Sequence, residues 1–162
     1  MKPFSYKKGS GLVEVIIVSS IVVLVISALI GSVTVYLKQS GKNINDVKSG
    51  YLLEEGIEAV KIMRNDSWTN NIANLNNGST YYLYFSTDSW TATTTSSLVD
   101  SRFVRTLTLS PVYRDANDDI ASSGTLDSGT KKVTVNVAWF DAASSATTSK
   151  SVSTYISNIY NN

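Results

Sequence analysis

An almost unbroken apolar run over residues 11–37 is the strongest hydrophobic pattern in the chain. Between Lys8 and Lys38 the only charged side chain is that of Glu14. As a helix this run would extend about 40 Å, which exceeds the ~30 Å hydrocarbon core of a bilayer. A secretory signal peptide has a shorter apolar region that ends at a cleavage site of small residues. The run therefore predicts a retained transmembrane helix over residues 11–37.

A second periodic pattern predicts that the same helix continues to residue 64. Apolar residues recur at spacings that fit one helical face, and charged residues fit the other face. The apolar set is Ile44, Val47, Tyr51, Leu52, Ala59, Val60 and Met63, and the charged set is Lys48, Glu54, Glu55, Glu58, Lys61 and Arg64. Glycines at positions 41, 50 and 56 oppose this prediction, because each weakens a helix by about 1 kcal/mol relative to Ala. The polar residues Asn65, Asp66 and Ser67 end the pattern.

The rest of the chain, residues 65–162, alternates apolar residues with Ser, Thr and Asn, which is typical of strands and turns. We predict strands over residues 79–85, 103–109, 131–140 and 151–160. The Ser- and Thr-rich residues 91–97 and 143–149 predict flexible loops. The expected fold class is α+β, in which a long N-terminal helix over residues 10–64 packs its outward half against a C-terminal antiparallel sheet domain.

Composition excludes several classes of function. A chain of 162 residues is long enough for one globular domain and one membrane span. It contains no Cys and no His, which removes disulfides, thiolate metal sites and the commonest general base. Without Lys2, Lys7 and Lys8 the formal net charge changes from +1 to −2, which argues against a nucleic-acid-binding protein. Because no nucleophile and base are paired in a known catalytic motif, we expect no enzyme and no cofactor.

Glu14 has two explanations, since an acidic side chain in a bilayer costs at least ~2.5 to 3.5 kcal/mol. It can reach water near the interface and interact with the N-terminal dipole of its own helix. It can also pair with a cation. If a peptidase cut the chain after Gly9, Ser10 would gain an α-amine with a pKa near 8, one helical turn before Glu14.

The sequence Lys7-Lys8-Gly9-Ser10-Gly11-Leu12-Val13-Glu14, followed by the apolar run, resembles the signal of type IV prepilins and type II secretion pseudopilins. The resemblance covers residues 1 to about 40. It implies that prepilin peptidase removes a leader of residues 1–9 and that Ser10 becomes N-methylated. It also implies that Glu14 pairs with the terminal amine of a neighbouring pilin or pseudopilin subunit as helices pack into a filament. Ser10 stands where the family usually has Phe, and Gly11 stands where it often has Thr.

The same signal predicts where the protein resides. Lys2, Lys7 and Lys8 would keep the N-terminus cytoplasmic by the positive-inside rule. The chain would then cross the cytoplasmic membrane once, with its C-terminal domain outside, before entering a pilus or pseudopilus. Gly31 stands where many major pilins have Pro, so it either permits helix bending or marks a close helix contact in the membrane.

Two polar clusters in the C-terminal half invite a chemical interpretation. Oxygen-bearing side chains at alternate positions, Asp115, Asn117 and Asp119, resemble the start of a calcium loop, but Ile120 replaces the Gly that such a loop requires. A loop stabilised by Asx turns explains the same residues, and we expect no metal site. The second cluster is basic and is interpreted as solvated surface. It comprises Arg102, Arg105, Arg114, Lys131 and Lys132.

Two functions from different classes remain after this reading of the sequence. The first is a filament subunit, whether major pilin, minor pilin or pseudopilin. The second is a membrane-anchored outward-facing binding domain, such as an adhesin, that does not polymerise. The amino terminus of the mature protein distinguishes them, because only the first requires the loss of residues 1–9.

Overall fold

A single helix takes up the first third of the chain. The computed structural model describes residues 10–141 and 144–160. Helix α1 spans Ser10–Asp66, so it continues through all three predicted weak points at glycine and ends at the predicted polar cluster. The chain divides into two compact units, the first ending at Asn43 and the second comprising Ile44–Asn162. The last part of α1 therefore belongs to the same unit as the sheet.

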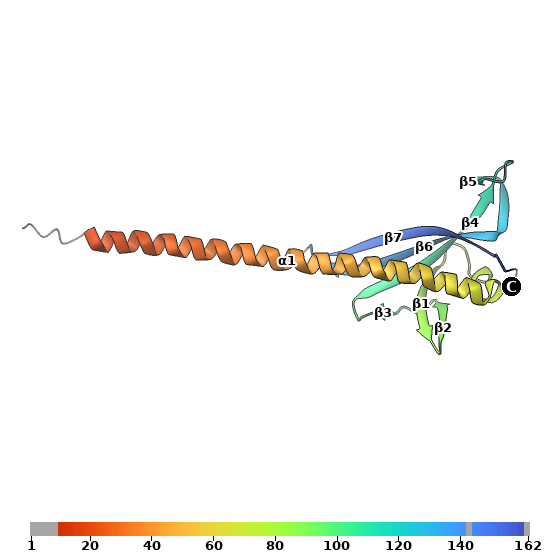
Figure 1. Cartoon of the computed structure of the whole chain (residues 1–162), viewed down its shortest axis with the longest axis horizontal. Helices are drawn as coiled ribbons and strands as arrows, with labels where there is room; N and C mark the ends of the chain where they lie inside the picture. Colours follow the sequence, from red (N-terminus) through yellow and green to blue (C-terminus); the bar gives the residue numbers. More distant parts are fainter. Residues whose placement is uncertain (1–9, 142–143, 161–162) are drawn as a thin grey trace, which may run out of the picture. The chain divides into compact units, whose positions relative to one another are not determined.

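The described residues of the second unit form a seven-stranded antiparallel sheet. The main strand order is β2-β1-β4-β6-β7, and the short strands β3 and β5 both pair with β4. The strands are β1 Thr80–Ser86, β2 Ser89–Thr93, β3 Leu98–Val99, β4 Phe103–Arg114, β5 Ile120–Ala121, β6 Thr125–Asp141 and β7 Ala146–Ser157. A short π-helix, Thr69–Ala73, lies between α1 and β1. Figure 1 shows the strands beside the part of α1 that belongs to this unit.

The core lies between one face of the sheet and one face of α1. Val133, Val135 and Val137 alternate along β6 and are fully buried, so they share one face of the strand. They lie in one cluster with Leu107 and Leu109 of β4. The contribution of α1 to this cluster is Leu52, Leu53, Ala59, Val60 and Met63. The α+β fold predicted from the sequence, with a long helix packed on a C-terminal antiparallel sheet, is confirmed.

The apolar face predicted for the outward half of α1 is partly wrong. Ile44, Val47 and Tyr51 are 63%, 59% and 69% exposed. The buried residues at this end of the helix include the polar Asn45 and Ser49. The helix therefore presents a mixed face to the sheet and leaves three large apolar side chains pointing away from the core.

Two segments predicted as flexible loops are partly strands. Residues 91–93 belong to β2, and residues 146–149 belong to β7, which extends from Ala146 to Ser157. Thr is a β-branched residue that suits a pleated strand, so a composition rich in Ser and Thr did not by itself indicate a loop. The four predicted strands all exist, as β1, β4, β6 and β7, with different ends.

The long strands β4 and β6 carry a polar loop away from the core. Their register shifts between Pro111 and Val112, beyond which Arg114 pairs with Thr125. Because Pro has no N–H to donate, a break in the ladder at this point is expected. The chain then turns through residues 115–119 into β5, which pairs back onto the end of β4.

Candidate functional site

The apolar part of α1 forms one candidate site, because its surface has no cover within the first unit. Its large apolar side chains are between 48% and 71% exposed over residues 12–37. Within the described residues α1 is the one helix long and apolar enough to cross a membrane. Exposed apolar surface of this size is costly in water, so lipid or other protein must cover it. The structure thus supports a single potential membrane-spanning segment.

The serine and threonine hydroxyl groups of this segment all donate to carbonyls of their own helix. Ser20 donates to the carbonyl of Ile16 at 2.7 Å, and Ser27 donates to the carbonyl of Val23 at 2.8 Å. The other serine and threonine hydroxyls of residues 11–37 behave in the same way, namely those of Ser19, Ser32 and Thr34. A hydroxyl bonded to a carbonyl three or four residues earlier needs no partner from lipid. The polar residues of this run are therefore compatible with a bilayer, apart from Glu14.

Glu14 lies in the second turn of α1 with its side chain exposed. Within residues 11–141 and 144–160, no side chain forms an ion pair with Glu14. Neighbouring positions of the helix are apolar and also exposed, including Val13 and Val15. A carboxylate on such a surface needs water or a cation from outside the described residues.

The remaining predicted residues of the N-terminal signal differ in how far the structure describes them. Gly9 lies outside the described residues. Ser10 is the first residue of α1, which places the proposed new terminus at the start of the helix. Gly31 lies inside α1, and a Cβ built there would meet no atom within 4 Å. The cleavage, methylation and assembly roles stay predictions.

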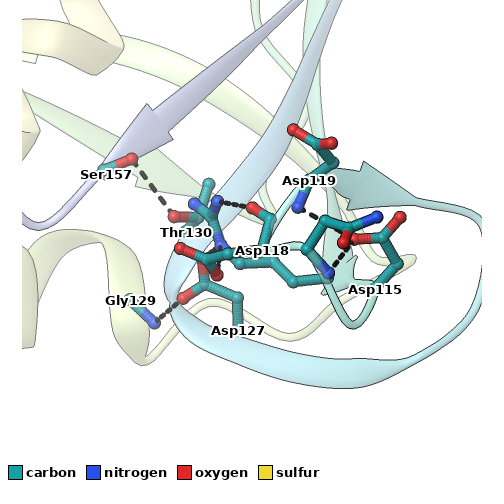
Figure 2. Close-up of polar contacts among 9 residues, drawn as sticks. Asp115, Asp118, Asp119, Asp127, Gly129, Thr130 and Ser157 are labelled. Atoms are coloured by element: carbon teal, nitrogen blue, oxygen red, sulfur yellow. Dashed lines mark hydrogen bonds and ion pairs between the residues drawn. The ribbon is translucent and has the colours of Figure 1, made fainter.

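The residues that resemble the start of a calcium loop form hydrogen bonds within their own turn. Oδ1 of Asp115 accepts hydrogen bonds from the backbone N–H of Asn117 at 2.8 Å and of Asp119 at 3.1 Å. Figure 2 shows Asp115 and Asp119 in this turn between β4 and β5. This is the Asx-turn geometry given above as the alternative. In the part of the chain that the structure describes, no group of three His, Cys, Asp or Glu side chains is placed to hold a metal ion.

An ion pair closes the base of that loop. Nε of Arg114 lies 2.7 Å from Oδ2 of Asp127, and Nη1 of Arg114 donates to the carbonyl of Asp118 at 2.7 Å. The hydrogen bond from Arg114 lowers the pKa of Asp127 below its ordinary value, and a hydrogen bond from Thr130 adds to this effect. Asp127 in turn raises the pKa of Arg114. Figure 2 shows Asp127 between this loop and Gly129, whose N–H also donates to it. Arg114 thus connects the loop, through Asp118, to Asp127 on β6.

Sequence reasoning placed Arg105 on a basic surface, and this is wrong. Its side chain is only 4% exposed, and Nη1 donates to Oε2 of Glu55 on α1 at 2.6 Å. The guanidinium also lies over the ring of Trp90, 5.1 Å from its centroid. The signal for burial was present, because Arg105 shares its alternation with Phe103, Leu107 and Leu109. Arg105 therefore links helix and sheet and has no free charge to offer a ligand.

The exposed apolar residues of α1 within the second unit are the surface feature that the sequence did not predict. Ile44, Val47 and Tyr51 recur at three and four residues, so they form one stripe along the helix. Since they do not face the core, their burial requires something outside this chain.

No family model, curated protein or solved structure matches the chain.

Proposed function

We propose that the chain is a structural subunit of a type IV pilus or a type II secretion-like filament, as a pilin, minor pilin or pseudopilin. The observation that carries this proposal is Glu14, the one charged residue between Lys8 and Lys38, exposed on an apolar helix immediately after Lys7, Lys8 and Gly9. A carboxylate at this position is costly in a bilayer unless a cation compensates it.

Cleavage by prepilin peptidase would supply that cation. Cutting after Gly9 leaves a positively charged amine on Ser10, and N-methylation does not remove the charge of a terminal amine. Packing of subunits would bring the amine of one copy to Glu14 of the next. Each charge then leaves water or lipid together with its partner, which lowers the cost of burying both.

The unpartnered surfaces of α1 support assembly as well. The apolar side chains of residues 12–37 and the stripe of Ile44, Val47 and Tyr51 are exposed in the isolated chain. Lipid can cover the first surface before assembly. A neighbouring helix can cover both in a filament, because helices pack through complementary apolar ridges and grooves.

The decisive experiment is mass spectrometry of the amino terminus of protein purified from cells that contain prepilin peptidase. We expect the mature chain to begin at methylated Ser10. A mature chain that retains residues 1–9 while the peptidase is active would contradict the proposal, because the compensating amine would never form.

A substitution at Glu14 separates processing from assembly. In Glu14→Ala we expect cleavage to continue and the amount of protein in sheared filaments to fall at least about tenfold, since the interfacial charge pair is lost. Val15→Ala is the matched control, because it shortens the neighbouring exposed side chain and leaves the charge in place. Equal incorporation of Glu14→Ala and Val15→Ala would remove the charge-pairing mechanism.

The second candidate function is a membrane-anchored binding domain that does not polymerise. The unit Ile44–Asn162 favours this candidate, because its hydrophobic core is formed within one chain. This candidate requires full-length protein that detergent extracts from membranes and that is missing from sheared filaments. The same purification therefore decides between the two.

A further inference from the structure

The exposed stripe on the outward half of α1 continues into two acidic residues. Ile44, Val47 and Tyr51 precede Glu54 and Glu58 on the same side of the helix, within about 80° of arc at 3.6 residues per turn. All five side chains are exposed. Oε1 of Glu58 accepts a hydrogen bond from Nζ of Lys61 at 2.7 Å, which leaves Oε2 of Glu58 available. We call these five residues the acidic ridge.

A shallow, mostly apolar depression on α1 is followed by two lysines on the same side of the helix. Ala28, Gly31 and Val35 recur at three and four residues and are followed by Lys38 and Lys42. These five positions also share about 80° of arc. The depression is lined by Ala28, Gly31, Ser32, Val35, Tyr36 and Gln39. Because Gly31 has no side chain and nothing lies within 4 Å of its Cβ position, the floor of the groove is open. We call the five residues the basic groove.

The ridge and the groove match position by position. One offset relates all five pairs, since 44 − 28 and 58 − 42 both equal 16. It sets Val47 against Gly31 and Tyr51 against Val35, so larger side chains meet smaller ones. It also sets Glu54 against Lys38 and Glu58 against Lys42. Two parallel helices with this offset would bury apolar surface and pair two acidic with two basic side chains.

We propose that the acidic ridge of one copy docks into the basic groove of a second copy. The two α1 helices would be parallel and offset by 16 residues, which is the separation between Lys38 and Glu54. This inference rests on the proposed filament function and names the contact that joins neighbouring subunits. Ridge and groove are different surfaces, so the contact is heterologous and leaves each copy a free ridge and a free groove. Such a contact repeats without closing, as a filament requires.

Disulfide crosslinking tests the offset directly, because the chain contains no cysteine. The full chain carrying Val35→Cys and Tyr51→Cys is expressed in cells that contain the peptidase and is oxidised in the membrane and in sheared filaments. Within one helix these positions lie too far apart to form a disulfide, so any bridge joins two copies. We expect a ladder of dimers and higher multimers. Val33→Cys combined with Tyr51→Cys is the matched control, since residue 33 lies on another side of the helix and should give no ladder.

Charge reversal tests the electrostatic part in the same cysteine background. Lys38→Glu with Lys42→Glu should lower the crosslink yield roughly tenfold, and Glu54→Lys with Glu58→Lys should do the same, because like charges then face each other. Combining all four substitutions should restore the yield. If the lysines serve lipid phosphates instead, the glutamate reversals leave the yield unchanged and the combined variant does not recover, which overturns the pairing.

The outcomes also separate this contact from the proposed function. Filaments that contain the cysteine variant but show no ladder between positions 35 and 51 overturn the offset while the filament function stands. A protein that forms neither filaments nor crosslinked multimers overturns both.

Discussion

At the scale of single residues, Gly56 shows why a residue that weakens a helix is kept inside one. A Cβ built on Gly56 would lie 2.7 Å from Cγ1 of Val135 and 3.3 Å from Cδ of Arg105. Val135 is fully buried on β6, and its branched side chain has little freedom to move. The missing side chain therefore allows α1 to approach the sheet closely and leaves room for Arg105 to reach Glu55.

We expect Gly56→Ala to destabilise the unit Ile44–Asn162 by about 1 to 2 kcal/mol. Overpacking a core costs about 1 to 3 kcal/mol, and the better helix propensity of Ala returns up to about 1 kcal/mol. Urea unfolding followed by tryptophan fluorescence measures this, since Trp68, Trp90 and Trp139 all lie in this unit. Gly50→Ala is the matched control on the same helix, because nothing lies within 4 Å of its Cβ position. It should stabilise the protein slightly, and a Gly56→Ala variant that behaves like it would refute the packing argument.

Arg105 marks the limit of sequence reasoning at this scale. Its charge suggested a solvated surface, although position 105 alternates along β4 with the buried Phe103 and Leu107. The conflict is resolved by Glu55 and Trp90, which come from α1 and β2. Partners so far away in the sequence become visible only once the helix lies on the sheet.

At the scale of elements, an ion pair joins the end of β4 to the start of β6 in addition to their backbone pairing. Beyond the register shift at Pro111 the two strands leave the core, and their residues there are mostly exposed or half-buried. Arg114 near the end of β4 and Asp127 on β6 connect them. In this part of the sheet an ion pair connects the side chains of the two strands, whereas in the core apolar side chains pack together.

The pair predicts how the stability of this hairpin depends on pH. Since the folded pKa of Asp127 lies below its ordinary value of 3.8, its contribution is complete above that value and is lost as pH falls through the lower folded pKa. Asp127→Asn should therefore destabilise the protein near neutral pH, and the difference from wild type should shrink below pH of about 4. Urea unfolding at several pH values measures this difference.

Asp88→Asn controls for the removal of one carboxylate. Asp88 lies in the exposed turn between β1 and β2 with φ 67°, a conformation that Asn also tolerates. We expect little change at any pH. A constant deficit of Asp127→Asn down to pH 2 would mean that the ionised pair does not stabilise the hairpin.

The helix and the main strands were largely predictable from the sequence, but which face of the helix is buried was not. Periodicity placed α1 and the four main strands, because spacings of 3.6 and 2 follow from backbone geometry. It also grouped Ile44, Val47 and Tyr51 with the core residues of α1, yet the sheet covers Asn45 and Ser49 instead. Which stripe of a helix meets a sheet depends on shape and on partners outside the chain, and a single sequence reports neither.

At the scale of the whole molecule, the two compact units differ in how the apolar side chains of their described residues are covered. The hydrophobic core draws its residues from Leu52 to Ile156, all within Ile44–Asn162. The described residues of the first unit are helical, and their large apolar side chains over residues 12–37 are exposed. Membrane association should therefore depend on the first unit, and folding should depend on the second.

We expect a chain truncated to residues 44–162 to be soluble and to unfold cooperatively, whereas the full chain should sediment with membranes. Fractionation and tryptophan fluorescence measure the two properties. A shorter chain, residues 57–162, is the matched comparison, because it loses Leu52 and Leu53 from the core and Glu55, the partner of the buried Arg105. An unpaired guanidinium and an uncovered sheet face should leave this chain aggregated or unfolded. Equal folding of both truncated chains would show that the helix residues before position 57 do not stabilise the sheet. Membrane binding by residues 44–162 would contradict the assignment of the membrane anchor to the first unit.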